Sequence, residues 1–310
     1  MNGFIFDINK CVGCHACVVA CSVENEDKPL SNWRNIHTYN KNTFPLLPVF
    51  NLSLACNHCE EASCMEACPA KAYSIDQFTG AVVLNSDVCI GCKYCTWACP
   101  YDAPKYDEIK GLVSKCTFCN SRLIEGGIPA CSRNCPTGAL DFNEIKDDHL
   151  DKYTQGFPQS SIHPRIRFIS SGNRKGPEVI PSPVSKQINE LIVSRLEIPD
   201  SKISLKREWT LLVFTLLVPL LVGTFSGILA GYVFINPWVY SFIGIVGLIL
   251  STLHLGKKSR AIYALKNLKT SWLSREVFFY GAFLLNTLLF YFFTGYKSMA
   301  WFYCYHLWSF

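Results

Sequence analysis

The sequence predicts a chain of two parts, an α+β amino-terminal domain built around cysteine-rich loops and an all-α carboxy-terminal domain of membrane-spanning helices. Two observations predict this division. The first half repeats a pattern of closely spaced cysteines separated by short strand-like segments. The second half contains 48 consecutive residues, 209–256, without a single Asp, Glu, Lys or Arg. A chain of 310 residues has room for both domains.

The clearest cysteine pattern is the run Cys89, Cys92, Cys95 and Cys99, which is followed directly by Pro100. This spacing, CxxCxxCxxxCP, is the bacterial run that holds [4Fe–4S] clusters. Three cysteines of such a run ligate one cluster, whereas the fourth ligates a different one. Runs of this type are therefore expected in pairs.

Three further runs accompany the first, and together the four account for 16 of the 17 cysteines, leaving only Cys304. Their members are Cys11, Cys14, Cys17 and Cys21; Cys56, Cys59, Cys64 and Cys68; and Cys116, Cys119, Cys131 and Cys135. Four sets of four thiolates predict four [4Fe–4S] clusters. A disulfide framework is disfavoured because adjacent CxxC pairs make poor structural disulfides and residues 1–7 carry no secretory leader. Zinc ribbons also use CxxC pairs, but they do not require the CxxCxxCxxxCP run.

The assignment of ligands depends on which runs pair. The outer runs are the first and the fourth along the chain, and the inner runs are the second and the third. If the outer runs pair with each other and the inner runs pair with each other, each cluster takes three cysteines from one run and the last cysteine of the partner run. Pairing in chain order is the alternative that spacing leaves open. The outer/inner scheme gives cluster 1 as Cys11, Cys14, Cys17 and Cys135; cluster 2 as Cys21, Cys116, Cys119 and Cys131; cluster 3 as Cys56, Cys59, Cys64 and Cys99; and cluster 4 as Cys68, Cys89, Cys92 and Cys95.

Short strands are predicted between the runs. Residues 4–8 and 33–39 read as strands, residues 45–48 as a turn, and residues 76–84 as a hairpin. The order of strand, cysteine loop, short helix and strand repeats, which predicts a duplicated ferredoxin-like domain over residues 1–149. His15, His37 and His58 lie near the loops, and we expect them to pack or hydrogen-bond because the cysteine count is already complete.

Charge is unevenly distributed along the chain. Residues 1–145 carry 11 Lys or Arg and 15 Asp or Glu, whereas the remainder carries 18 and 9. The acidic balance of the cysteine-rich half argues against a nucleic-acid partner. The basic surplus adjoins the apolar segments, where a membrane surface is the expected partner.

Residues 150–207 are predicted to be a linker or a segment that docks a partner subunit. Proline recurs throughout it, which prevents long regular elements, although residues 185–195 fit one short amphipathic helix. Residues 208–310 then form the predicted membrane anchor. The uncharged segment is long enough for two spans of about 20 residues joined by a turn at 232–238. A third apolar run covers 277–294, and the aromatic residues 299–310 are a possible start of a fourth span.

His254 and Glu276 stand at the two membrane boundaries of the loop between the second and third spans. Ionisable groups at the edge of a span are functional candidates, and a histidine with a carboxylate can accept the two protons that a quinol releases. The alternative is that both simply lie at the level of the lipid headgroups. Because two spans return the chain to its starting side, this loop is predicted on the same side of the membrane as the cysteine-rich domain.

With these residues in view, the chain resembles a known family. In the spacing of its four cysteine runs, the segment 1–150 is similar to the four-cluster subunit of dimethyl sulfoxide reductase-type molybdoenzymes. The segment 208–296 resembles the beginning of their membrane anchor, on the motifs Arg207-Glu-Trp209, His254-Leu-Gly256, Arg260-Ala261 and Leu273-Ser-Arg-Glu276. The chain thus resembles a fusion of the two subunits.

The resemblance supports the outer/inner pairing. It implies that cluster 4 lies nearest the membrane and accepts electrons from menaquinol, while cluster 1 faces a separate catalytic subunit with a molybdenum bis-pterin cofactor. His254 and Glu276 match quinol-site residues of the anchor, and Arg260 matches a motif position that we include in the quinol-site hypothesis. Some relatives have tryptophan at the position of Cys92 and hold a [3Fe–4S] cluster there, so Cys92 implies four cubanes. The chain itself would be a non-catalytic electron-transfer subunit, with quinol oxidation at its anchor.

Two features depart from the family. Its anchors have about eight spans, so either this sequence is truncated, which we expect, or its anchor is abbreviated. The loops on the cysteine-rich side carry the basic residues, which by the positive-inside rule places that domain in the cytoplasm, whereas the family relationship implies the periplasm.

Two other functions remain open on the sequence. The same series of clusters could run in reverse, from a dehydrogenase or hydrogenase partner into quinone. A ferredoxin-like or zinc-stabilised adaptor with an incidental anchor is the third hypothesis. The terminal substrate is not encoded in these motifs.

Overall fold

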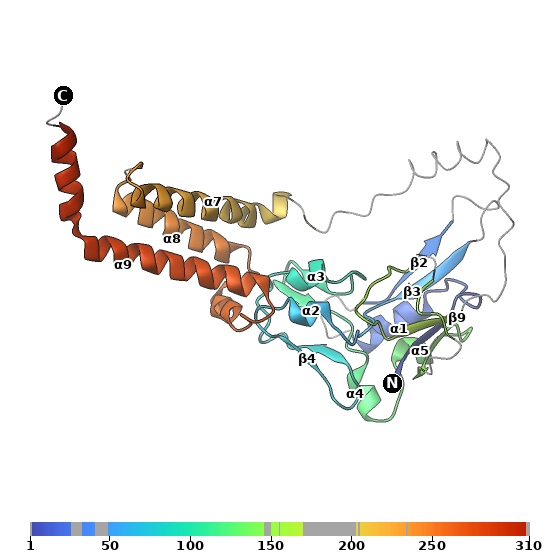
Figure 1. Ribbon diagram of the computed structural model, residues 1–310. Coiled ribbons are helices and arrows are strands. Elements are labelled where there is room, and N and C mark those ends of the chain that lie inside the picture. Colours follow the sequence, from blue (N-terminus) through green and yellow to red (C-terminus); the bar gives the residue numbers. More distant parts are fainter. Residues whose placement is uncertain are drawn as a thin grey trace, which may run out of the picture. The chain divides into compact units, whose positions relative to one another are not determined.

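The computed structural model describes residues 2–25, 33–40, 49–145, 150–154, 156–169, 203, 205–233 and 235–307, and it divides into two compact units (Figure 1). The first unit comprises Met1–Glu66, Ala72–Asp87 and Lys93–Lys202. The second comprises the helical region Ile203–Phe310 together with two short pieces of cysteine loop, Ala67–Lys71 and Val88–Cys92. The predicted turn at 45–48 and helix at 185–195 lie outside the described residues.

A three-stranded sheet joins the beginning of the first unit to its end. Strand β1 (Asn2–Asp7) lies in the middle, antiparallel to β8 (Leu140–Glu144) and parallel to β9 (Ile166–Ile169). The predicted strand at 4–8 is thus confirmed. Its inward side chain Phe4 meets Phe118 and Phe142 edge to face, with ring centroids 5.4 and 5.5 Å apart. This buried aromatic group forms the core beneath the cysteine loops.

Strand β9 lies inside the segment that we expected to be a linker. Phe157 and Phe168 are buried, with ring centroids 4.9 Å apart, and Asp151 pairs with Phe168 through two backbone hydrogen bonds. The described residues 150–154 and 156–169 therefore belong to the cysteine-rich domain rather than to a linker that starts at residue 150. The sequence did not predict this strand because it has only four residues, 166–169, and lies in a segment where proline recurs.

Three hairpins connect the cysteine loops. They are β2 (Asn35–Tyr39) with β3 (Phe50–Leu54), β4 (Tyr73–Ile75) with β5 (Val82–Leu84), and β6 (Lys105–Asp107) with β7 (Leu112–Ser114). The predictions at 33–39 and 76–84 are confirmed, although β4 ends before Asp76. The turns after β4 and β6 are alike: the carboxylates of Asp76 and Asp107 each accept two backbone N–H groups, and Gly80 and Gly111 follow with positive φ.

Short helices follow or contain the cysteines. They are α1 (Ala16–Glu24), α2 (Ser63–Glu66), α3 (Tyr94–Ala98), α4 (Asn120–Ile124) and α5 (Ala130–Arg133). Cys17 and Cys21 lie on α1, Cys64 on α2, Cys95 on α3 and Cys131 on α5. The helices therefore fix the backbone of the third cysteine in each run, and in the first run that of the fourth as well.

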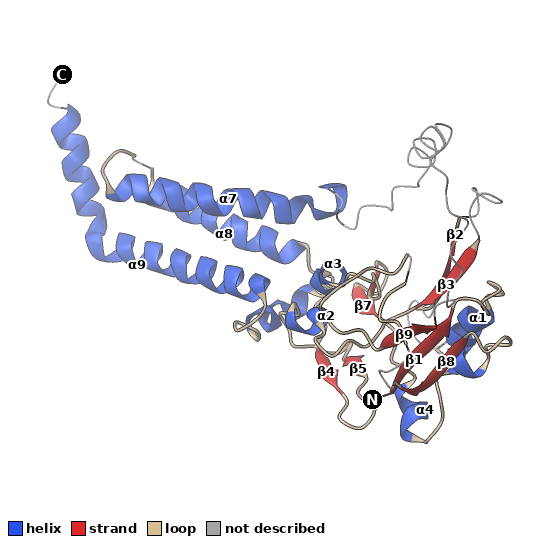
Figure 2. Ribbon diagram, turned by 45° about the vertical axis from the view of Figure 1, so that its right-hand side comes forward, coloured by secondary structure: helices blue, strands red, loops and turns tan. Residues whose placement is uncertain are grey.

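The helices α7 (Leu205–Leu229), α8 (Pro237–Leu253) and α9 (Trp272–Leu307) of the second unit run side by side, with the 3₁₀ helix η1 (Lys258–Leu265) between α8 and α9 (Figure 2). Pro237 begins α8, and the side chain of Asn236 caps it by accepting the N–H of Trp238 at 2.9 Å. Glu208–Leu229 and Trp272–Phe293 are long and apolar enough to cross a membrane; α8 counts as a third only together with η1, across a bend of 102°.

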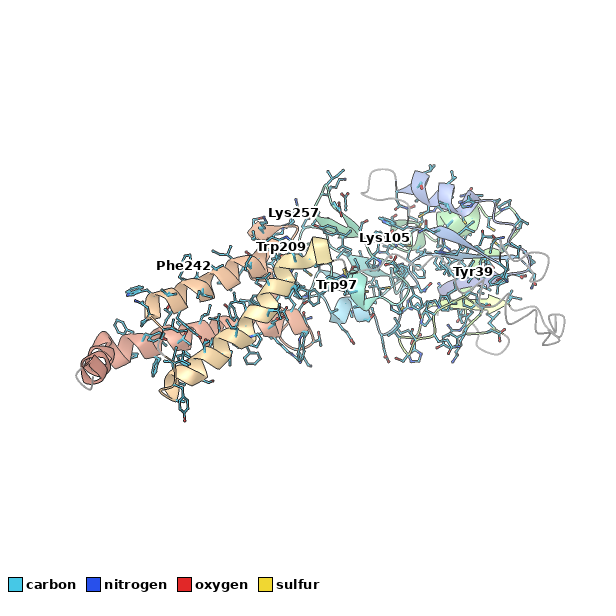
Figure 3. The ribbon with its side chains drawn as sticks, turned by 90° about the horizontal axis from the view of Figure 1, so that it is seen from above. Tyr39, Trp97, Lys105, Trp209, Phe242 and Lys257 are labelled. Atoms are coloured by element: carbon cyan, nitrogen blue, oxygen red, sulfur yellow. The ribbon has the colours of Figure 1, made fainter. Side chains whose placement is uncertain are left out.

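Small residues let α8 and α9 approach closely. A Cβ on Gly244 would lie 2.5 Å from Leu284, and one on Gly247 would lie 2.5 Å from the Tyr280 hydroxyl. Tyr280 also donates a hydrogen bond to the Gly244 carbonyl at 2.8 Å. Large apolar side chains such as Phe242 point away from the bundle instead (Figure 3), with 67% of the side chain exposed. Close packing inside and apolar side chains outside are the pattern of a bundle whose surroundings are lipid.

Candidate functional site

All four cysteine loops share one backbone feature, a residue with positive φ just before the second cysteine. Gly13 and Gly91 adopt a φ of 69°, His58 45° and Phe118 66°. Glycine takes this conformation without strain, whereas it costs other residues about 1–2 kcal/mol. At His58 and Phe118 the two buried rings stack, with centroids 4.1 Å apart, which offsets part of that cost. His58 also accepts the Val82 N–H, so it packs and hydrogen-bonds as predicted.

We group the cysteines of the first unit into sets 1, 2 and 3, named after the clusters that they are predicted to hold. Electrostatic interactions join Cys11 to Cys14, Cys17 and Cys135 in set 1. Others join Cys59 to Cys56, Cys64 and Cys99 in set 3. Cys116 interacts with Cys21, Cys131 and Cys119 of set 2, but most strongly with Cys56 of set 3. Most of these interactions link cysteines that the outer/inner scheme assigns to one cluster, and the pairing itself stays a prediction.

The remaining cysteines, set 4, fall in both units. Cys68, Cys89 and Cys92 belong to the second unit, with the anchor helices, and Cys95 belongs to α3 of the first. All four are buried. None of the sixteen cysteines in the four sets forms a disulfide. No three Cys, His, Asp or Glu side chains in the described ranges gather as the ligands of one metal ion would.

Burial disfavours the ionised form of several thiols in sets 2 and 3. Burial, together with neighbouring thiols, raises the pKa of Cys64 to about 12 and that of Cys119 to about 11. The same causes hold the pKa values of Cys59 and Cys116 above their ordinary range. Thiolates at these positions therefore require a cationic core between them, which the irons of a cluster supply.

Two buried cations complement these sets. Arg34 is 1% exposed and Lys115 is 3% exposed, and within the described part of the chain neither forms an ion pair with a carboxylate. A buried charge without a counter-charge costs several kcal/mol. A thiolate-ligated cluster is negatively charged overall, so the residues present fit such a group.

Set 1 is the exposed end of the first unit. Cys14 is exposed and Cys11 and Cys135 are half-buried, whereas every cysteine of sets 2 and 3 is buried. Around set 1, Val12 and Val19 expose 67% and 60% of their surface. An apolar rim beside an accessible redox group is typical of a protein–protein contact.

In the second unit, the loop after α8 holds the two pieces of cysteine loop through their backbone carbonyls. Arg260 Nη1 donates to the Cys89 carbonyl at 3.0 Å, and Asn267 Nδ2 donates to the Cys68 carbonyl at 2.9 Å. The backbone N–H groups of Gly256 and Lys257 donate to Gly91 and Ile90, and Ser271 donates to Ala67. The segment from Gly256 to Ser271 thus fixes the backbone of the set 4 loops.

The predicted quinol-site residues lie at the two ends of this loop and within it. His254 is buried at the end of α8, and Glu276 is half-buried in the second turn of α9. Arg260 lies between them in the chain and contacts the set 4 loop through the Cys89 carbonyl. Sequence reasoning missed Arg34 and Asn267, which no motif marked. Lys115 directly precedes Cys116, and that adjacency was the available signal.

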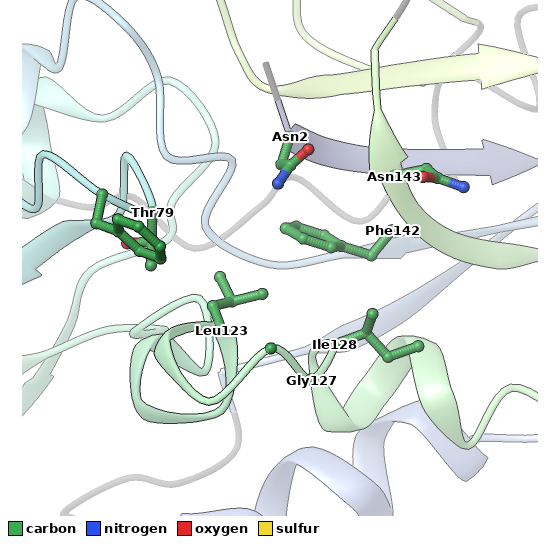
Figure 4. Close-up of a pocket in the computed structure, with 9 residues that line it drawn as sticks. Asn2, Thr79, Leu123, Gly127, Ile128, Phe142 and Asn143 are labelled. Atoms are coloured by element: carbon green, nitrogen blue, oxygen red, sulfur yellow. The ribbon is translucent and has the colours of Figure 1, made fainter.

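A pocket of about 250 Å³ opens elsewhere on the first unit, between the β4–β5 turn, α4 and the edge of the sheet (Figure 4). Its lining residues, which include Thr79, Leu123 and Phe142, have no titratable side chain. It therefore has no groups for redox or acid–base chemistry.

Comparison with known proteins agrees with this arrangement. Residues 48–145 match the family of 4Fe-4S dicluster domains, and residues 204–309 match the DMSO reductase anchor subunit (DmsC) family. One relative is a component of the anaerobic dimethyl sulfoxide reductase of Escherichia coli (strain K12). It is 40% identical to the present protein over 178 residues, which are 54% of this sequence and 83% of the relative.

Other relatives carry different names. A component of the sulfite dehydrogenase of Allochromatium vinosum is 32% identical over 62% of this sequence and 82% of its own length. Hydrogenase-2 operon protein HybA of Escherichia coli O157:H7 is 34% identical over 55% of this sequence and 61% of its own length. The cysteine ladder and the anchor thus occur in one polypeptide, and the protein is a member of the dimethyl sulfoxide reductase-type iron–sulfur proteins, as a fusion of their electron-transfer subunit with their membrane-anchor subunit.

Proposed function

We propose that this chain passes electrons from menaquinol through four [4Fe–4S] clusters to a molybdopterin-containing catalytic subunit, as the electron-transfer and anchor subunit of an anaerobic terminal reductase. The observation that carries the proposal is the set of hydrogen bonds from the anchor loop to the carbonyls of Cys68 and Cys89. They fix the membrane-associated part of the chain to the loops of set 4. An electron that leaves a quinol in the anchor therefore has set 4 as its nearest acceptor.

The order of the other sets follows from the thiols. Cys64 and Cys68 belong to one run and Cys95 and Cys99 to another, so set 4 adjoins set 3 along both runs. Cys56 of set 3 interacts electrostatically with Cys116 of set 2. Sets 2 and 1 share α1, which carries Cys21 and Cys17. Each bound cluster would take up one electron and release it without a proton. The exposed set 1 supports the exit to the catalytic subunit.

At the other end, His254 and Glu276 would accept the two protons of the quinol as its two electrons depart. Histidine side chains can accept a proton near neutral pH, and a carboxylate supplies the second acceptor. The segment between them, from Gly256 to Ser271, holds the set 4 loops. The proton acceptors and the loops of Cys68, Cys89 and Cys92 are thereby held in the same unit.

The reverse direction is the second candidate. The names of the relatives include a sulfite dehydrogenase and a hydrogenase operon protein. In that case a dehydrogenase or hydrogenase partner would supply the electrons and quinone would accept them. Isolating the complex with its catalytic partner separates the two: oxidation of menadiol driven by an oxidant such as dimethyl sulfoxide supports the first direction, and reduction of menadione driven by the partner's substrate supports the second.

The order of the clusters predicts different defects in two ligand variants of the purified full chain. In Cys92→Ser, set 4 is impaired, so menadiol should leave the remaining clusters oxidised although dithionite reduces them. In the matched variant Cys14→Ser, at the opposite end, menadiol should still reduce the other three clusters. Electron paramagnetic resonance after each reductant provides the measurement. Equal reduction by menadiol in both variants would contradict the arrival of electrons at set 4.

The proposed proton acceptors predict a separate defect. His254→Gln and Glu276→Gln should each lower the rate of cluster reduction by menadiol at least 100-fold, because general-base catalysis contributes about 10²–10⁴. Reduction by dithionite and the iron content should stay unchanged. The control is Asn286→Ala, which changes an exposed residue on α9, the helix that carries Glu276. If menadiol reduces the clusters of a variant as fast as those of the unmodified chain, the substituted residue is not part of the quinol site.

We place the cysteine-rich domain in the cytoplasm, because the loop after α8 carries Lys257, Lys258, Arg260, Lys266 and Lys269 while the α7–α8 turn carries no charge. A protease site inserted at the exposed Tyr232 should be cut from outside in intact spheroplasts, whereas one inserted at the exposed Ile109 should be protected. The opposite pattern would put the domain in the periplasm.

A further inference from the structure

Arg34 is a buried cation whose hydrogen bonds lead to a cysteine of set 1. Its Nη1 donates to the Ser53 carbonyl at 3.0 Å and to Ser53 Oγ at 3.1 Å. Ser53 Oγ in turn lies 3.2 Å from Cys17 Sγ. The guanidinium also lies 4.6 Å from the centroid of the Phe4 ring. The side chain is therefore held in place on several sides.

Arg34 also contacts set 2, because its backbone N–H donates a hydrogen bond to the sulfur of Cys21. Burial opposes the charge, yet cysteines of set 2, Cys131 and Cys116 foremost, and Cys17 of set 1 raise the pKa of Arg34 above its ordinary value. No carboxylate in the described ranges takes this role. Arg34 thus lies between sets 1 and 2.

Lys115 occupies the corresponding place between sets 2 and 3. Its Nζ lies 3.6 Å from Cys56 Sγ of set 3 and donates to the carbonyl of Cys116 in set 2 at 3.0 Å. It also donates to the Val82 carbonyl. With 3% exposure, its ammonium is almost as completely removed from water as the Arg34 guanidinium.

We propose that Arg34 and Lys115 set the reduction potentials of the clusters beside them, Arg34 for clusters 1 and 2 and Lys115 for clusters 2 and 3. The inference rests on the proposed function, since it assigns a role within that electron path. Neither residue ligates a cluster; both act through the charge that they hold next to it.

The direction of the effect follows from charge. Each reduction brings one electron from a neighbouring cluster or from the quinol and adds one negative charge, with no bond formed and no proton taken up. A fixed positive charge in a buried, low-dielectric place stabilises the more negative, reduced state. Arg34 and Lys115 therefore raise the potentials, and their removal lowers them. Cluster 4, whose loops are held by the anchor, is the internal reference.

The test is a redox titration of the purified full chain, followed by electron paramagnetic resonance. Arg34→Met should favour the oxidised forms of clusters 1 and 2 at least tenfold, which is about 59 mV for a one-electron couple. Lys115→Met should do the same for cluster 3, with a smaller shift at cluster 2. In the charge-conserving variants Arg34→Lys and Lys115→Arg, the ratio of oxidised to reduced cluster at a given applied potential should stay within threefold of the unmodified chain. Lys110→Met, which removes an exposed cation from the same unit, should shift none.

Other results would overturn the inference. If the methionine variants carry four clusters whose ratios of oxidised to reduced form stay within threefold of the unmodified chain, the two cations do not set the reduction potentials. Glutamine variants are prepared in parallel; if every neutral variant loses iron while the charge-conserving ones retain it, the cations serve assembly instead. An unmodified chain with fewer than four clusters would contradict the proposed function, whereas four clusters with unmoved potentials would contradict only this inference.

Discussion

The structure depends on one electrostatic constraint, the ionisation of buried thiols. In the first unit, burial raises the pKa values of Cys59, Cys64, Cys116 and Cys119, so these thiols hold a proton unless a cation replaces it. Iron supplies that cation, and the resulting cluster is an anion that is removed from water. Arg34 and Lys115 then make sense as buried cations without carboxylate partners in the described part of the chain. Thiols, irons and buried cations form one balanced system of charges, so cluster assembly and folding are expected to be coupled.

The anchor contributes through a second requirement of the cysteine loops, the hydrogen bonding of their backbone carbonyls. Carbonyl groups in tight cysteine loops need hydrogen-bond donors, and the loops of set 4 obtain them from Arg260, Asn267 and Ser271 of the anchor loop. The His254-Leu-Gly256 and Arg260-Ala261 motifs are thus structural in part: Gly256 and Arg260 position the backbone of a cluster loop. A fusion of the two subunits keeps both partners of these hydrogen bonds on one polypeptide.

The sequence was informative where chemistry requires fixed spacing. The cysteine runs located all four loops, and glycine marks the positive-φ position in two of them, at Gly13 and Gly91. The hairpin at 76–84 was recognised by its turn, whereas β6 and β7 were missed although Asp107 and Gly111 repeat the turn of Asp76 and Gly80. The other misses involve contacts between distant residues. Strand β9 forms because β1 offers it an edge, and Arg34 is buried because Ser53 and Phe4 lie beside it; neither is visible from local pattern.

The measurement that tests the central claim most directly is the iron and acid-labile sulfide content of the anaerobically purified protein, combined with Mössbauer spectroscopy. Four cubanes predict about 16 iron and 16 sulfide per polypeptide, in the spectra of [4Fe–4S] clusters, and no bound zinc. A preparation that holds about four zinc ions, or one in which fully reconstituted material carries far fewer irons, would contradict the account.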